Sequence, residues 1–211
     1  RVGVAQIDIT PPAGRATELS GFVARIQPAL GVHDPLVARA LYLSDGRQRL
    51  LWLHADLIGF EAEDVAALQR TLRARFGLAP HEICVSATHT HSGPPTVRLL
   101  NCGAYDAEYV AWLMQQLVNV ATAAAAAPEE AELLVTEGSC RLAIDRRGKP
   151  TKHTDPRVGV LAWRRRGQQA PGEYVAVLAN YAMHNVALGP ESRLVSADMA
   201  GRAATRIRAA V

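Results

Sequence analysis

The stretch ICVSATHTHSGPP, residues 83–95, joins a short apolar run to a loop that contains two histidines. Residues 83–87 have the length and apolar content of a strand, and Gly93 with the prolines after it marks a loop. His89 and His91 are separated by one residue, so on an extended backbone both imidazoles project to the same side. We therefore expect two neighbouring rings at the end of a strand, where loops hold ligands rigidly.

Strand-like and helix-like segments alternate on both sides of this loop. The opening is rich in turn residues, Asp45-Gly46 predicts a hairpin, and Gly77 and Pro128 end two helical patterns. The pattern predicts an α/β fold with mixed β-sheets, helices packed outside and the histidine loops converging at one edge. We expect strands at 36–43, 50–58, 83–87, 133–136, 158–163 and 174–181, and helices at 65–76, 109–127 and 198–211.

A second histidine follows a strand much later in the chain. The predicted strand 174–181 runs into Ala182-Met183-His184-Asn185. Neutral imidazole nitrogens are good zinc ligands, and a loop at a strand end leaves a coordination position open. A His-x-His pair alone is more typical of a structural or incidental role, so the spacing by itself does not decide between that role and a metal site.

Composition restricts the class of protein and its partners. The chain has 211 residues, and its 23 Lys and Arg are spread out and accompanied by only 5% aromatics, which argues against nucleic-acid binding. No apolar run reaches the roughly 18 residues of a transmembrane segment. The three cysteines lack the spacing of a zinc knuckle or a disulfide framework. The compartment stays open between cytoplasmic, periplasmic and secreted, and the oligomeric state is not predicted.

Both ends of the sequence suggest a longer polypeptide. The first residue is Arg1 and not Met, so a removed leader is compatible with it. The last helical pattern, from Asp198 to Val211, has no capping glycine. We expect residues 1–211 to form a single domain that is the N-terminal part of a larger hydrolase domain.

Several segments, taken together and in order, resemble the neutral/alkaline (non-lysosomal) ceramidase family. The resemblance is spread over almost the whole chain, and its most specific part is THTHSGP followed by a strand ending in a lone histidine and then SAD. The segments are DITPP at 8–12, GVHDPLVARALYL at 31–43, LWLHADL at 51–57, THTHSGP at 88–94, DRRGKPTKHTDPRVGVLAW at 145–163 and NYAMHNVALGPESRLVSADMAG at 180–201.

The resemblance implies a role for four residues. In the family the first histidine of THTHSGP and the histidine of the later strand bind a catalytic zinc, which points to His89 and His184. The second histidine of the motif, His91, is expected beside the metal, in contact with substrate or intermediate. The family's substrate-pocket arginine corresponds to Arg146, although Asp145 stands where the family has Asn.

The ligand set is incomplete within this chain. A catalytic zinc has three or more protein ligands, and the family draws a Glu, a Tyr and a serine nucleophile from later in the polypeptide. Asn185 also stands where the family often has Pro. Asp56 and Asp198 are in-chain alternatives, each as an extra oxygen ligand or as an acceptor that orients a bound histidine. A plain hydrogen-bonding role for Asp56 and a helix cap for Asp198 are the competing interpretations.

The remaining histidines have structural or surface interpretations, and Arg39 is expected in an internal ion pair. These histidines are His33, His54, His81 and His153.

The expected function is a zinc-dependent hydrolase that cleaves the amide bond of an N-acyl substrate. Zinc polarises an amide carbonyl, and a nearby His and Arg stabilise the oxyanion. The substrate is a ceramide-like lipid of sphingolipid metabolism or a related small-molecule amide. The alternative is a non-catalytic binding or structural module that keeps the fold. A metal-dependent phosphoesterase is a third hypothesis, but such an enzyme would require more aspartates near the metal.

Overall fold

A computed structural model describes residues 1–148, 153–167 and 174–211, so residues 149–152 of the quoted segment 145–163 lie outside it. The described part is a mixed α/β structure with several sheets and three α-helices, which confirms the predicted fold class. The elements are β1 (Val2–Asp8), β2 (Gly31–Val32), β3 (Val37–Ser44), β4 (Arg49–Ala55), α1 (Ala62–Phe76), the 3₁₀ helix η1 (Pro80–Glu82), β5 (Ile83–Ala87), α2 (Ala107–Ala126), β6 (Ala131–Ser139), β7 (Arg157–Arg165), β8 (Tyr174–Tyr181), β9 (Leu194–Val195) and α3 (Asp198–Ala210).

A four-stranded sheet in the order β1-β3-β4-β5 forms the centre of the molecule. The hairpin predicted at Asp45-Gly46 joins antiparallel β3 and β4, and the Asp45 carboxylate accepts backbone N–H groups from Arg47 and Gln48. Strand β5 pairs parallel to β4. The helix α1 provides the crossover that a parallel pair requires.

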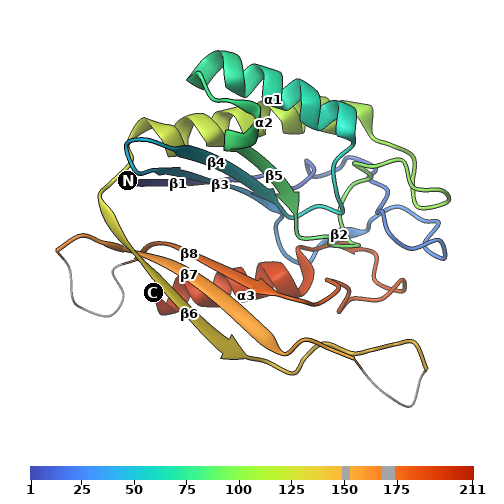
Figure 1. The fold of residues 1–211 in the computed structure, drawn as a ribbon. Coiled ribbons are helices and arrows are strands. Elements are labelled where there is room, and N and C mark those ends of the chain that lie inside the picture. Colours follow the sequence, from blue (N-terminus) through green and yellow to red (C-terminus); the bar gives the residue numbers. More distant parts are fainter. Residues whose placement is uncertain (149–152, 168–173) are drawn as a thin grey trace.

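Helices α1 and α2 cover one face of this sheet (Figure 1). Both carry an apolar stripe, and Leu72 of α1 and Leu113 of α2 are fully buried with Leu53 of β4. Helix α1 ends at Gly77, whose left-handed φ of 62° returns its N–H to the Arg73 carbonyl, as the sequence predicts. Burial of these stripes is the main stabilising contribution to the fold.

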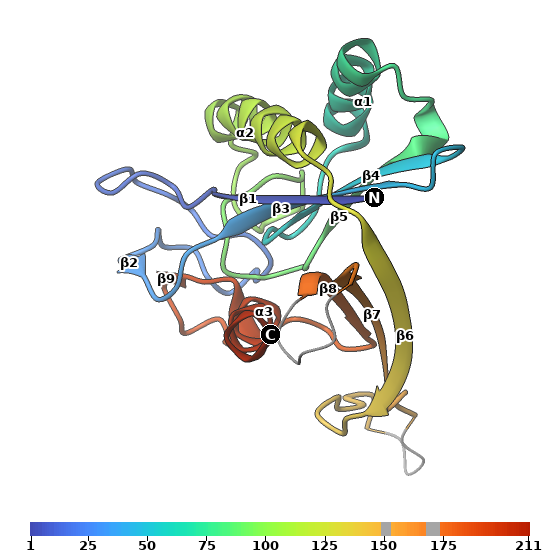
Figure 2. The same cartoon turned by 90° about the vertical axis from the view of Figure 1, so that its left-hand side faces the viewer.

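A second sheet, β6-β7-β8, and helix α3 lie on the other side of the central sheet (Figure 2). The two-residue strands β2 and β9 pair in parallel and join the early loop to the segment before α3. The loops that follow β5 and β8 come together on the side away from the N-terminus (Figure 1). Within the described residues, no helix combines the length and apolar character needed to cross a membrane.

Strand β1 lies in the opening that the sequence analysis assigned to turns. Residues 2–8 pair antiparallel with β3 along their whole length. Gly3 and Gln6 weaken the local strand signal, but Gly3 is required by packing. A Cβ at Gly3 would lie 1.9 Å from the Ala124 carbonyl oxygen of α2. Residues 2–8 therefore form a strand because they fit between β3 and α2. The local sequence pattern does not reveal that fit.

Truncation of Leu113 tests the contribution of the helix–sheet core. Leu113 has 0% of its surface exposed, whereas Leu100 is 87% exposed. We expect Leu113→Ala to lower the free energy of unfolding by about 2–5 kcal/mol, because it removes buried contacts and leaves a cavity. Leu100→Ala should leave it within about 0.5 kcal/mol of the original protein. Urea unfolding followed by circular dichroism measures both, and equal effects would contradict this packing.

His54 lies on β4 and contributes to the central sheet through Ser86 of β5. Its Nδ1 lies 2.9 Å from the Ser86 Oγ, which also accepts a hydrogen bond from Trp52 Nε1. Burial, with a smaller contribution from the Arg39 charge, lowers the pKa of His54 from 6.5 to about 4. The folded protein therefore holds this imidazole neutral at pH values where the unfolded chain protonates it.

Acid destabilisation is the consequence of this lowered pKa. Between about pH 6.5 and pH 4 the unfolded state binds the His54 proton and the folded state does not, so the free energy of unfolding falls as the pH falls. We expect the free energy of unfolding of His54→Gln to fall by about 2 kcal/mol less than that of the original protein over this pH range. Urea unfolding at pH 7.5 and pH 4.5 measures it, with His81→Gln, at an exposed histidine, as the control. Parallel pH profiles for both variants would contradict the assignment.

Candidate metal centre

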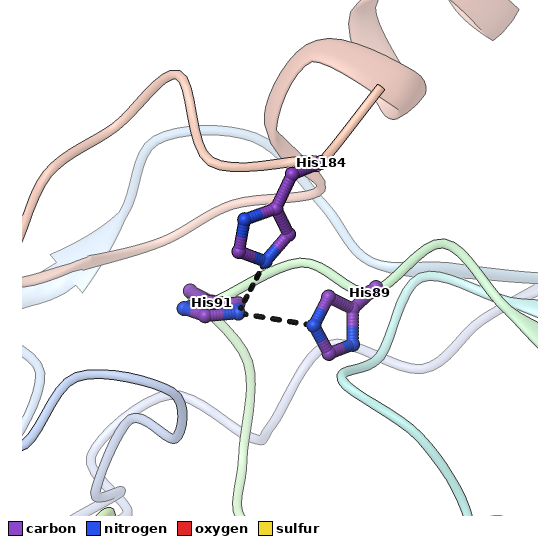
Figure 3. Close-up of side chains that lie close together, drawn as sticks. All are labelled: His89, His91 and His184. Carbon is purple, nitrogen blue, oxygen red and sulfur yellow. Dashed lines mark hydrogen bonds between the residues drawn. The ribbon is translucent and has the colours of Figure 1, made fainter. Parts of the chain in front are cut away.

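The loops after β5 and β8 bring three histidine rings together (Figure 3). The Nε2 of His91 lies 3.3 Å from the Nε2 of His89 and 3.2 Å from the Nε2 of His184. The three ligand atoms all lie within 4.8 Å of one another. Among the described residues this is the one group of three or more His, Cys, Asp or Glu side chains with the spacing of a metal site.

His89 reaches the cluster by a backbone conformation that differs from the extended one expected from the His-x-His spacing. Its φ is 61°, in the left-handed region that a non-glycine residue rarely adopts. Its Nδ1 lies 2.8 Å from the carbonyl oxygen of Ile58, to which it donates. That hydrogen bond leaves Nε2 with a free lone pair facing the cluster, which is the usual arrangement of a metal-bound histidine.

His91 is the buried member of the cluster. Its exposed fraction is 8%, and its Nδ1 has no hydrogen-bond partner in the described residues. Burial is the largest cause that lowers the pKa of His91 to about 4, and the neighbouring His89, His184 and Arg25 lower it further. The ring is therefore neutral at physiological pH and can offer its Nε2 lone pair.

His184 lies at the exposed side of the cluster, directly after β8. Arg146 donates from its guanidinium to the Nδ1 of His184 across 3.2 Å, which places Arg146 beside the ring. Burial, His89 and Arg146 lower the pKa of His184 below its usual value. Although the sequence separates Arg146 from His184 by more than thirty residues, the structure brings these two predicted site residues into contact.

Three neutral rings in this arrangement cannot all satisfy their hydrogen bonds with one another. The bond to Ile58 leaves a lone pair on His89 Nε2, and the bond from Arg146 puts the proton of neutral His184 on Nε2. If His91 Nε2 is unprotonated, its lone pair faces the lone pair of His89. If His91 Nε2 carries the proton, its N–H faces the N–H of His184. A metal ion removes the conflict between lone pairs, so the donor set fits a divalent metal.

Hydrogen bonds join the loop that carries His89 and His91, and the loop that carries His184, to the segment around Ser196 before α3. The hydroxyl of Thr90 donates to the Ser196 carbonyl across 2.7 Å, and the Ser196 N–H donates to the Ser92 carbonyl. The Asn185 side chain bonds both the Ala197 carbonyl and the Ala200 N–H. The sequence predicts no site role for these residues, because their partners lie far away in the sequence or depend on loop geometry.

The two predicted aspartates lie outside the histidine cluster. Asp56 is completely buried and accepts a hydrogen bond from Arg39 across 2.9 Å, which confirms the internal ion pair expected of Arg39. Its Oδ1 has no partner in the described residues, and burial raises the pKa of its carboxyl. The Asp198 carboxylate accepts the backbone N–H groups of Ala187, Leu188 and Met199.

The fold and the cluster define an α/β protein in which two strand-end loops present three imidazoles that can hold a metal. Residues 1–144 match the model of a family described as "Neutral/alkaline non-lysosomal ceramidase, N-terminal". The chain therefore belongs to the neutral/alkaline non-lysosomal ceramidase family, as the resemblance indicated. The matched residues include His89 and His91 and end before Arg146 and His184.

Two solved structures share the fold of this chain. The crystal structure of neutral ceramidase from Pseudomonas aeruginosa matches with a TM-score of 0.80 and 22% sequence identity, over 93% of this chain and 34% of that one. A ceramidase complexed with C2 matches with a TM-score of 0.79 and 22% identity, over 94% of this chain and 33% of that one. The chain thus spans about a third of the length of these proteins.

Proposed function

We propose that this chain supplies the histidine part of a zinc-dependent amide hydrolase that acts on an N-acyl substrate, a ceramide-like lipid or a related amide. The convergence of three imidazole nitrogens within 4.8 Å of one another carries this proposal. Membership of the ceramidase family supports amide hydrolysis as the reaction. Zinc is the metal that best fits neutral imidazole ligands without a redox role.

His89 and His184 are the proposed zinc ligands. His89 is supported by its hydrogen bond to Ile58, which fixes the tautomer that a ligand needs. His184 requires its proton on Nδ1 to offer Nε2, and Arg146 must then give up its bond to that atom. Metal binding would therefore leave the Arg146 guanidinium available to a substrate.

Arg146 is proposed to stabilise the charge that develops during amide cleavage, and His91 is proposed to transfer a proton. Bound zinc would supply a Lewis acid that polarises the amide carbonyl and lowers the pKa of a bound water or hydroxyl group. Arg146 is exposed beside His184, where a guanidinium can bind the oxyanion of a tetrahedral intermediate. His91 is neutral and buried against the other rings, so it can accept or return a proton at Nε2.

The rest of the site is proposed to come from outside these 211 residues. Three protein ligands or more are usual for catalytic zinc, and we propose that residues 1–211 act as the N-terminal part of the hydrolase domain. Asp198 is proposed to organise the loop that carries His184, since its carboxylate is already bonded to three backbone N–H groups. Asp56 retains one unpartnered oxygen, bonds Val37 and Arg39 through the other, and is proposed to fix the end of β4 against β3.

Zinc content provides the first test. We expect about one zinc per intact protein by mass spectrometry of the metal, and loss of most of it in His89→Ala and His184→Ala, because each change removes a ligand. His81→Ala, at an exposed histidine outside the cluster, should keep the metal. Absence of zinc from the original protein, or its retention in both cluster variants, would favour a non-catalytic module with the same fold.

Arg146 provides a test of the chemistry. We expect Arg146→Ala to lower kcat/KM for a fluorescent short-chain ceramide by about 10²–10³-fold, because it removes a charge from the oxyanion. Its zinc content and melting temperature should stay unchanged, since the side chain is exposed. Arg157→Ala removes another exposed arginine, paired with Asp155, and serves as the control. The assignment is wrong if both variants hydrolyse the substrate equally well.

A further inference from the structure

The backbone of Gly21 lies directly against the ring of His91. A Cβ at position 21 would come within 2.4 Å of the His91 Cγ and 2.6 Å of its Nδ1. Gly21 also has a φ of 105°, which residues with a side chain rarely adopt. The ring can occupy its position only because residue 21 has no side chain.

Phe22 and Arg25 complete the contact with His91. The Phe22 ring meets the imidazole edge-on at a centroid distance of 4.8 Å, with an angle of 67° between the planes. The Arg25 guanidinium lies 5.1 Å from the centre of the Phe22 ring, within the range of a cation–π contact. The Phe22 ring therefore contacts both the imidazole and a cation.

Arg25 joins three separate segments through their carbonyl oxygens. Its guanidinium donates to the carbonyls of Ser20, His91 and Ser192, and the residue as a whole is only 6% exposed. No carboxylate among the described residues forms a salt bridge with it. A buried arginine is costly, and here its hydrogen bonds hold the loop of His91 against the segment that follows His184.

We propose that Gly21, Phe22 and Arg25 form a seat that positions the His91 ring in the cluster. The seat closes the Nδ1 side of the ring and directs Nε2 toward His89 and His184. The inference deepens the proposed function, on which it rests, since a correctly aimed His91 is required for proton transfer there. Gly21, Phe22 and Arg25 are positioning residues and reach the reacting atoms only through His91.

Gly21→Ala and Gly14→Ala form a matched pair for the test. Both glycines have a positive φ, 105° and 82°, but a Cβ at Gly14 meets no atom within 4 Å. In the intact protein labelled with ¹⁵N-histidine and freed of metal, we expect Gly21→Ala to shift the His91 ring resonances and Gly14→Ala to leave them in place. With zinc restored, Gly21→Ala should lower kcat for the fluorescent ceramide by about 10–100-fold, by the usual effect of groups that orient active-site residues.

Arg25 adds a second pair of variants. Arg25→Lys keeps a cation that can donate to carbonyls and should retain most of the activity, whereas Arg25→Met should lose activity and displace the His91 resonances. If Arg25→Met does not fold, the Gly21→Ala comparison decides the proposal.

Different results would overturn the seat around His91 and the proposed hydrolase function. His91 resonances that are unchanged in Gly21→Ala, relative to Gly14→Ala, would overturn the seat while leaving the hydrolase proposal intact. An original protein that binds zinc but cleaves no amide would overturn the proposed function, and the resonances of the metal-free protein would still test the seat.

Discussion

The histidine cluster depends on hydrogen bonds that join the loop after β5 to the segment before α3. The Thr90 hydroxyl donates to the Ser196 carbonyl, and the Ser196 N–H donates to the Ser92 carbonyl. The buried guanidinium of Arg25 adds a third connection, to the carbonyls of His91 and Ser192. The strands β5 and β8 belong to different sheets, so contacts between loops, and not strand pairing, bring their ends together.

The cluster combines a stable framework with local strain. The helices α1 and α2 bury the central sheet and hold the end of β5 in place. His89, in the loop after β5, and Asp198, at the first residue of α3, both have positive φ values, 61° and 56°. Such conformations cost free energy and persist where surrounding contacts determine them. The apolar core therefore supports two locally strained backbone positions beside the three imidazole rings.

Charge around the cluster favours neutral imidazoles. Burial is the largest cause that lowers the pKa of His91 and of His184, and the positive charges of Arg25 and Arg146 add to it. A metal ligand must be unprotonated, and the neutral rings meet that requirement. The same two arginines differ in exposure, because Arg25 is buried in the framework whereas Arg146 faces the solvent. Arg25 is thus part of the framework, and Arg146 is the residue proposed to contact the substrate.

The sequence alone determined the α/β class, the Asp45-Gly46 hairpin, the helix end at Gly77 and the placement of His89 and His184 after strands, because periodicity and turn residues act locally. Tertiary structure decided the rest. Strand β1 depends on close packing of Gly3 against α2. The meeting of the histidines and the contacts of Arg25 join residues 66 to 167 positions apart, and such distant partners leave no trace in local sequence.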